Sequence, residues 1–397
     1  MNIKNIFLNL SIFEAIAKGG NWLLLAILPF FIEPKTYGNI VLLSSYLLFV
    51  SSVGALGQNT VILRYIDSSN TKNIPYNLLI SLLGTILTYL VMLLWGKLDN
   101  SYHLLLFFTA ILYTSYSLHI ALARKTATAS EFGWIRISYA FARLLIGFLL
   151  IVVFEQAVYY LVAELLALIF GLFVKKTIFK TFTGFSGSFR NGYFKKSLRF
   201  GTPLTLHALT SFVLAYSDRL ILSIYLPIVV VGQYGALYTF ASSLTFIYVI
   251  LAVKWEVVIY NAKTIELAEN YANKFLRQCL ILGGAVSLGV VIFYNYFLSK
   301  MHYGEQDSLI SFILVLLGHL IMPFFFKMNY LLAKIEKTYL ITISSLIAAI
   351  INIAMNFYLI PTKGVMGAAL STLISYFTLY AISMTLYHFN DFRSKKR

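Results

Sequence analysis

Several ionisable side chains lie inside long apolar runs of this chain, where a charged group needs an explanation. A charge at the centre of a membrane-spanning helix costs about 2.5–3.5 kcal/mol on insertion scales. In the first apolar run, Glu14, Lys18 and Asn21 follow one another at i, i+4 and i+7, so they share one arc of a helix. In the fifth run, Arg136 and Arg143 share a face at a spacing of seven.

Lys18 and Arg143 are the two cations of this set that point most directly to a ligand. If their runs begin near residues 10 and 135, each lies about 12 Å along its helix. Two cations at similar depth predict a cavity open to the cytoplasm, with Arg64 and Arg136 at its mouth. A phosphate-bearing substrate suits such a cavity, because Arg binds phosphate oxygens in pairs and Lys acts as a point charge.

Each of these two cations also has a purely structural alternative. Lys18 could pair with Glu14 along its own helix, one turn away. Arg143 could bond to helix carbonyl groups or to Glu164. The sequence leaves both alternatives open.

Polar groups of another kind occur in the second half of the chain. Asp218 and Arg219 stand near the outer end of the seventh run, about 27 Å along it. Asp218 could carry a coupling Na⁺ or H⁺, or either residue could form an ion pair at the rim. Asn352 and Asn356 form a stripe with Ser345 in the eleventh run, which suits interhelical hydrogen bonding or the lining of a cavity.

The elements that must position these residues are apolar helices. Of the 397 residues, 59% are hydrophobic and 12% are charged, whereas a soluble domain is about 25% charged. This composition excludes a water-soluble enzyme, a disordered protein and a secreted disulfide scaffold. A membrane-spanning helix needs roughly 20 apolar residues. The sequence contains twelve such runs, at about residues 10–31, 40–62, 76–96, 102–123, 135–154, 157–175, 200–225, 233–255, 276–298, 308–327, 338–359 and 366–388.

The net charge of +16 is explained mainly by topology. With both termini in the cytoplasm, nearly all basic residues fall in inner loops, as the positive-inside rule requires. The outer loops hold only Lys35, Lys97, Lys300 and Lys363. Attraction to anionic membrane lipids accounts for the rest of the positive charge. Nucleic acid is therefore not needed as a partner to explain it. We therefore predict a multi-pass membrane protein.

The longest polar stretch divides the runs into two sets of six. We predict an N-terminal six-helix bundle at 1–178, a cytoplasmic basic linker at 179–199 and a C-terminal six-helix bundle at 200–397. A faint repeat that matches Gly38 to Gly232 favours two pseudo-symmetric bundles around a central cavity. In transporters built from such parallel repeats, the substrate path runs between the halves.

Motifs for catalysis or cofactor binding do not occur in the sequence. It contains no G-x-x-x-x-G-K-[ST], G-x-G-x-x-G, H-E-x-x-H or C-x-x-C pattern. We therefore expect no ATP hydrolysis by a P-loop, no cofactor, no metal centre and no enzymatic activity. Repeated filter sequences typical of ion channels are also missing.

Two ordered sets of motifs resemble a known family. The first set is Leu198–Pro203 (LRFGTP), Ser217–Arg219 (SDR) and Val231–Tyr234 (VGQY), which resembles the seventh-helix signature of bacterial polysaccharide flippases. The second is Asn352 and Asn356 followed by IPTKGVMGAALST, which resembles the segment between the eleventh and twelfth helices of that family. A weaker match covers residues 54–65.

The chain thus resembles the O-antigen, or Wzx-type, flippases of the multidrug/oligosaccharidyl-lipid/polysaccharide (MOP) exporter superfamily. The resemblance implies transport of an undecaprenyl-pyrophosphate-linked oligosaccharide from the cytoplasmic to the outer leaflet of the bacterial inner membrane by alternating access. It also implies a role in O-antigen, lipopolysaccharide or capsule assembly, with other polysaccharide-assembly membrane proteins as partners.

Two other functions remain as alternatives. A cation-coupled exporter of drugs or small molecules in the same superfamily would depend on Asp218 and Glu14 more than on Lys18. A membrane glycan polymerase normally has a large outer loop, and the spacing of the apolar runs leaves no room for one.

Overall fold

The computed structural model describes residues 3–66, 73–174, 191–294, 296 and 308–395. Throughout these residues the chain is helical, with short turns and no strand. Eight segments of the described chain are long and apolar enough to cross a membrane, and Val158–Phe173 is a shorter apolar helix. The longest of the eight segments, Thr338–Asn390, contains a helix break at Gly364, where φ is +55°. The predicted all-α membrane fold is confirmed.

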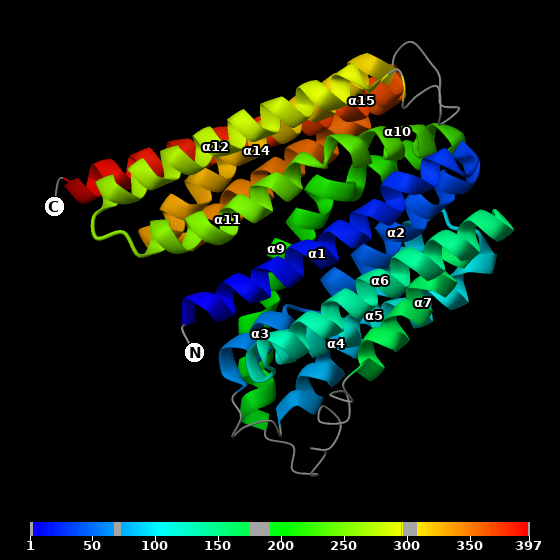
Figure 1. Cartoon of the computed structure of the whole chain (residues 1–397), viewed down its shortest axis with the longest axis horizontal. Coiled ribbons are helices and arrows are strands. Elements are labelled where there is room, and N and C mark those ends of the chain that lie inside the picture. The colour runs from blue at the N-terminus through cyan, green and yellow to red at the C-terminus, as the bar shows by residue number, and fades with distance from the viewer. Residues whose placement is uncertain (1–2, 67–72, 175–190, 295, 297–307, 396–397) are drawn as a thin grey trace. The chain divides into compact units, whose positions relative to one another are not determined.

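The chain forms two compact units, Met1–Phe212 and Val213–Arg397 (Figure 1). The helices of the first unit are α1 Ile3–Ile27, α2 Pro34–Gly54, α3 Gln58–Tyr65, α4 Ile74–Trp95, α5 Asn100–Thr126, α6 Ala129–Phe154 and α7 Val158–Phe173, with a short 3₁₀ turn at Leu28–Phe30. The helices of the second unit are α10 Ile228–Ala241, α11 Leu244–Tyr260, α12 Ile265–Ile292, α14 Ser308–Lys334 and α15 Thr338–Lys395. Helix α9, Asn191–Tyr225, begins in the first unit and ends in the second.

Within the described residues, each of the twelve predicted runs falls on helical segments, but two of the runs are divided between two α-helices. The second run is divided between α2 and α3, and the eighth between α10 and α11. The prediction of one continuous span at 40–62 is therefore wrong. Between α2 and α3, Leu56 and Gly57 adopt positive φ angles of 48° and 66°, which end the helix.

Close backbone packing gives the reason for this break. A Cβ atom at Gly84 of α4 would lie 2.3 Å from the carbonyl oxygen of Gly54. A Cβ atom at Gly201 of α9 would lie 2.4 Å from the carbonyl oxygen of Leu56. The α2–α3 connection is thus held between α4 and α9 by glycines that leave no room for a side chain.

The predicted linker at 179–199 lies largely outside the described residues. Its last part, from Asn191, is the beginning of α9 and belongs to the first unit. The packing boundary between the units falls after Phe212, within that helix. The predicted cavity between the two bundles stays a prediction.

Several helix ends are fixed by local side-chain chemistry. Thr128 and Glu131 form a capping box at the start of α6: the Thr128 Oγ1 atom accepts from the Glu131 backbone N–H, and a Glu131 carboxylate oxygen accepts from the Thr128 backbone N–H. Pro34 and Pro75 occupy first-turn positions of α2 and α4, where the missing N–H is not needed.

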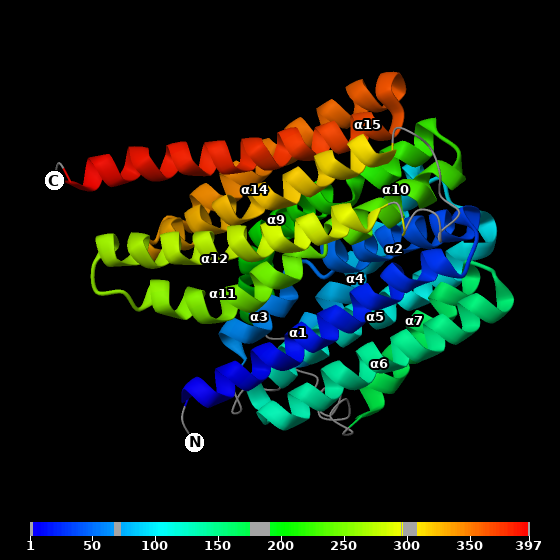
Figure 2. The same cartoon turned by 45° about the horizontal axis from the view of Figure 1, so that its top comes forward.

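Inside the first unit, α1 packs along α6, and α6 packs along α7. Figure 2 shows α1 and α6 side by side, as Figure 1 does. A buried apolar cluster joins α5, α6 and α7 around Tyr116, Ile135, Tyr139 and Leu168. The packing of α6 on α7 and of α1 on α6 positions the charged residues of the candidate site.

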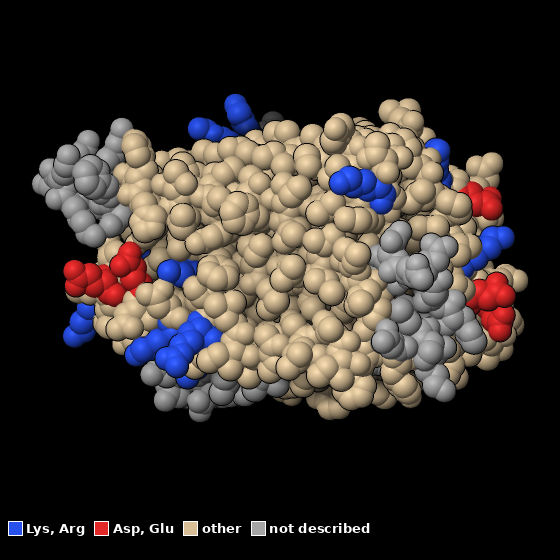
Figure 3. Space-filling view, turned by 90° about the horizontal axis from the view of Figure 1, so that it is seen from above, with Lys and Arg blue, Asp and Glu red and all other residues tan. Residues whose placement is uncertain are grey.

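In the second unit, α11 and α12 form an antiparallel pair, and α14 packs on α10, α11, α12 and α15. On the face in view in Figure 3, the Asp and Glu side chains lie near the two ends, and mostly uncharged residues, with a few Lys and Arg side chains, cover the band between them. Such a band is expected of a surface that faces the hydrocarbon of a bilayer.

Candidate functional site

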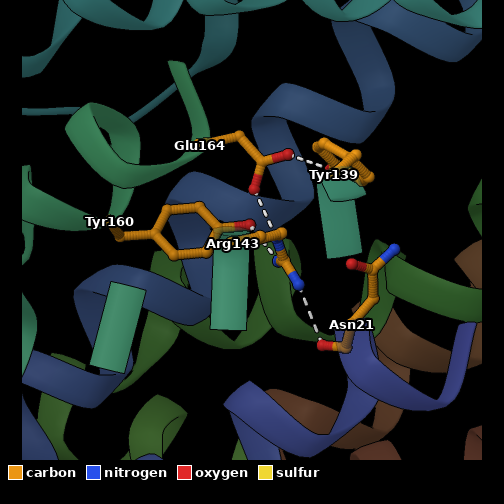
Figure 4. Close-up of polar contacts among 5 residues, drawn as sticks. All are labelled: Asn21, Tyr139, Arg143, Tyr160 and Glu164. Carbon is orange, nitrogen blue, oxygen red and sulfur yellow. Dashed lines mark hydrogen bonds and ion pairs between the residues drawn. The ribbon is translucent and has the colours of Figure 1, made fainter. Parts of the chain in front are cut away.

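Arg143 of α6 is the centre of a buried polar network in the first unit. Its Nε atom donates to Glu164 of α7 at 2.5 Å, and its Nη1 atom donates to the backbone oxygen of Asn21 in α1 at 2.9 Å. Its Nη2 atom donates to the hydroxyl of Tyr160 at 3.1 Å, and the hydroxyl of Tyr139 donates to Glu164. Figure 4 shows these five residues gathered around the guanidinium group from three helices.

The network neutralises the charge of Arg143 within the protein. Arg143 is 6% exposed and Glu164 is 1% exposed, so the pair is largely removed from solvent. Removing one partner of a buried ion pair costs about 3–5 kcal/mol. The predicted contact of Arg143 with substrate therefore stays a prediction. In the structure, the guanidinium joins α1, α6 and α7.

Arg136, two turns before Arg143 on α6, pairs with Glu14 of α1. Both bonds are 2.8 Å long, from Nε and Nη2 of Arg136 to the two carboxylate oxygens of Glu14. The side chains are 12% and 33% exposed. A bidentate pair of this kind fixes orientation as well as distance.

These two contacts link α1 to α6 at two levels along the helices, and we call them rungs. Glu14 contacts Arg136, and Asn21 contacts Arg143. Both helices advance by seven residues from one rung to the next, about 10.5 Å along the axis. The equal advance means that the two helices run parallel and in register. The spacing of seven residues found in the sequence is thus the spacing between the two rungs.

Lys18 lies between the rungs on α1, and its side chain is exposed. Its potential intrahelical partner, Glu14, is occupied by Arg136. Within the described residues, Lys18 forms no ion pair and no hydrogen bond. It stands about 14 Å from the end of α1 at Ile27. Among the described residues, the structure therefore leaves the ammonium group of Lys18 without a partner, well inside helix α1.

The surroundings of Lys18 show which side of α1 is open. A Cβ atom at Gly19 would meet nothing within 4 Å, whereas one at Gly20 would touch Ala140 of α6 at 3.4 Å. Ala17 and Leu24 are buried. Helix α1 is therefore packed on α6 through one side and is uncovered, within its own unit, at Lys18.

Arg64 lies at the last turn of α3, and its side chain is exposed. Its guanidinium carbon lies 4.7 Å from the centroid of the Phe200 ring and 5.5 Å from that of Tyr65. The structure brings Arg64 together with the start of α9 and not with the Arg143 network.

In the second unit, Asp218 of α9 is fully enclosed. Its Oδ2 atom accepts from the hydroxyl of Tyr234 at 2.5 Å, and its Oδ1 atom accepts from the backbone N–H of Arg219. Arg219 donates from Nη1 to a backbone oxygen, and its guanidinium carbon lies 4.1 Å from the ring centroid of Tyr238. The two residues are 3% and 7% exposed, so both lie inside this unit.

Asn352 and Asn356 of α15 belong to a second buried network of this unit. The Asn352 Oδ1 atom accepts from Ser217 at 2.7 Å and from the Asn356 amide at 3.0 Å. The Asn352 amide donates to Ser375 at 3.0 Å. The Oδ1 atom of Asn356 is buried and has no hydrogen-bond partner among the described residues. Asn352 therefore joins helices, while the Oδ1 atom of Asn356 stays unpaired within the described residues.

The sequence did not indicate the tyrosines that complete these networks. Tyr160 stands one turn before Glu164 on α7, and that spacing is the one signal that could have found it. Tyr234 was singled out within the VGQY motif and not as a partner of Asp218. Tyrosines abound in the apolar runs of this chain, so residue type alone does not single out the tyrosines that complete the networks.

Metal ligation has no support in the described part of the chain. No group of three or more His, Cys, Asp or Glu residues there is placed to hold a metal ion.

The fold of this chain defines its class: it is the fold of the MOP superfamily transporters. An inward-facing MATE family multidrug resistance transporter has a TM-score of 0.74 and 14% identity, over 100% of this chain and 96% of that one. The lipid II flippase MurJ, in an inward closed conformation, has a TM-score of 0.70 and 15% identity, over 95% and 86%. A MOP superfamily transporter from Pyrococcus furiosus has a TM-score of 0.55 and 15% identity, over 99% and 96%. At such identities the likeness shows the fold alone.

Sequence comparison gives the family itself. The model of the polysaccharide biosynthesis protein family matches residues 3–255, well over half of the chain. The chain therefore belongs to the polysaccharide biosynthesis protein family and is a multi-pass membrane protein with a transporter fold. No curated protein matches it in sequence.

Proposed function

We propose that this protein moves undecaprenyl-pyrophosphate-linked oligosaccharides from the cytoplasmic to the outer leaflet of a bacterial inner membrane by alternating access. Both termini would be cytoplasmic, as the basic loops predict. The family concerns polysaccharide biosynthesis, and one neighbour in fold is a lipid II flippase. The product would enter O-antigen, lipopolysaccharide or capsule assembly, alongside other membrane proteins of that assembly.

The observation that carries the proposal is the exposed ammonium of Lys18. An uncompensated charge within the membrane is costly against hydrocarbon, so this face of α1 must border water or a ligand. A diphosphate is a suitable counterion, because it offers several anionic oxygens to a single cation. Lipid tails would stay in the bilayer while the hydrophilic glycan passes Lys18.

The two rungs on α6 keep this cation in place. Because Arg136 engages Glu14, the carboxylate is not free to neutralise Lys18. Arg143 holds the backbone of α1 at Asn21, less than one turn further along. We assign Arg136 and Arg143 as positioning residues, which act on the substrate through the placement of Lys18, and Arg64 to the entrance.

The second unit favours a coupling role for a Na⁺ ion or a proton. Asp218 offers a buried carboxylate, and Asn356 offers a buried oxygen without a partner. These groups also support the second candidate function, a cation-coupled exporter of drugs or small molecules. In both candidate functions, a cation that binds in this unit would drive the change of the transporter from one access state to the other.

Deletion of the gene in its native bacterium tests the proposal. Lipid-linked oligosaccharide should accumulate at the cytoplasmic leaflet, and surface glycan should disappear and return on complementation. A Lys18→Arg variant should complement and Lys18→Ala should not, at equal protein levels in the membrane. Normal surface glycan in the deletion strain would contradict the proposal, and drug sensitivity with intact glycan would favour the exporter.

A further inference from the structure

Two cations and two aromatic rings meet where α3 ends and α9 begins, within the first unit. Arg64 lies over the rings of Phe200 and Tyr65, and the Nζ atom of Lys196 lies 4.2 Å from the centroid of Tyr65. The two rings contact each other edge to face, with centroids 5.3 Å apart at 76°. We call Arg64, Tyr65, Lys196 and Phe200 the cationic–aromatic cluster.

The positive charge of this cluster is not neutralised by nearby residues of its own helices. Neither α3 nor α9 up to Phe212 contains an Asp or Glu residue. The side chains of Lys195 and Arg199, one turn apart on α9, are exposed as well and add two further positive charges. Within the described residues, the end of α3 and the first part of α9 therefore carry several positive charges and no negative one.

Aromatic faces hold these cations without using up their N–H donors. Among the described residues, neither Arg64 nor Lys196 donates a hydrogen bond, and both side chains are exposed. Arg143 differs in this respect, because its donors are spent on a carboxylate, a carbonyl and a hydroxyl. Arg64 and Lys196 keep their donors for an external anion.

A buried polar network joins the two helices of the cluster, α3 and α9, to α4. The Ser197 hydroxyl donates to Gln58 at 2.6 Å, and the Asn77 amide donates to the same oxygen at 2.8 Å. Tyr193 donates to Asn77 at 2.9 Å. Gln58, Asn77 and Ser197 are 0% exposed. Since these residues belong to α3, α4 and α9, the network sets the register in which Arg64 meets Phe200.

The position of the cluster along its helices indicates the kind of anion. Arg64 and Tyr65 end α3, and Lys196 precedes the apolar run of α9 that begins near residue 200. Basic and aromatic residues at the ends of membrane helices lie at the depth of the lipid headgroups. Phosphate groups of lipids are the anions found there.

We propose that the cationic–aromatic cluster is a binding site for the phosphate group of a membrane lipid. The guanidinium of Arg64 would bind two phosphate oxygens and the ammonium of Lys196 a third. The phosphate belongs either to a bulk anionic phospholipid or to a phosphorylated polyprenyl carrier. The site does not depend on the proposed glycan transport, because a bulk phospholipid would engage the same groups.

The test compares lipid retention by the purified full-length protein and two double variants in native mass spectrometry. Arg64→Gln with Lys196→Gln removes two charges from the cluster. The control, Lys263→Gln with Arg277→Gln, removes one exposed Lys and one exposed Arg for which no aromatic partner occurs among the described residues. The probes are phosphatidylglycerol, undecaprenyl phosphate and neutral phosphatidylcholine.

The cluster variant should retain anionic lipid about tenfold less than the wild type, while the control and phosphatidylcholine show no such change. Loss of both anionic lipids identifies a bulk phospholipid site, and loss of undecaprenyl phosphate alone identifies the carrier. Equal retention of both by the wild type and the cluster variant overturns the proposal.

A second measurement needs only the wild-type protein. Acetylation of Lys196 by a water-soluble reagent should fall several-fold in nanodiscs containing phosphatidylglycerol or undecaprenyl phosphate, relative to phosphatidylcholine alone. Lys263, also exposed, serves as the internal reference. Equal acetylation of Lys196 in all three membranes would overturn the proposal even if the variants failed to fold.

Discussion

Replacement of Glu164 by Gln should be among the most destabilising single changes in the first unit. The substitution keeps the shape of the side chain and a hydrogen bond to Tyr139, but it leaves Arg143 charged and 6% exposed. Since the lost partner is a buried carboxylate at 2.5 Å, we expect a loss of about 3 kcal/mol in the free energy of unfolding.

Glu14→Gln is the matched control, since it breaks the other rung between α1 and α6. Glu14 is 33% exposed, so solvent screens its pair with Arg136, and we expect a loss below about 1 kcal/mol. Both changes remove one carboxylate from an Arg–Glu pair. The two pairs differ chiefly in burial.

A double-mutant cycle isolates the pair itself. Arg143→Met removes the cation, so the double variant with Glu164→Gln leaves no buried charge without a partner. The double variant should therefore cost much less than the sum of the two single variants, with a coupling energy of at least about 3 kcal/mol.

Unfolding of the purified protein in mixed micelles of increasing sodium dodecyl sulfate, followed by tryptophan fluorescence, measures each free energy. If Glu164→Gln proved as mild as Glu14→Gln, or if the effects of the two substitutions at Arg143 and Glu164 were simply additive, the reasoning from burial would be refuted.

Three further predictions concern other parts of the chain. Lys18→Ala should abolish glycan export while Lys18→Arg retains it, at unchanged thermal stability; activity of the alanine variant would remove the cationic site. Gly201→Ala should lower stability by about 1–3 kcal/mol, because its Cβ would lie 2.4 Å from a backbone carbonyl oxygen. Gly192→Ala on the same helix has open space and should be neutral or slightly stabilising. Asn352→Ala should lower the melting temperature, since three hydrogen bonds are lost. Asn356→Ala should instead weaken the dependence of transport on Na⁺ or pH, and the reverse pattern would contradict the roles assigned here.

The order and number of apolar runs determined the fold class of this protein. Each run became helical because continuous apolar stretches of this length satisfy the backbone internally only as helices within a membrane. The sequence also determined that Glu14 shares a helix face with Asn21, and Arg136 with Arg143. The members of each pair are seven residues apart, and residues two turns apart lie on the same face.

The partner of each charged residue was decided by tertiary structure. Glu14 stands one turn from Lys18, yet it pairs with Arg136 on another helix. Pairing between helices depends on rotation and register, which arise from the packing of whole faces, such as Gly20 of α1 against Ala140 of α6. Helix periodicity does not encode that register.

The same distinction explains why the cations differ in character. In sequence, Lys18 and Arg143 are both single basic residues at similar depth in apolar runs. Packing buries Arg143 against Glu164 and leaves Lys18 exposed between two rungs. The sequence determined that charges enter the membrane, and the packing of α1, α6 and α7 decided which charge stays available, because only a neighbouring helix can supply or withhold a counterion.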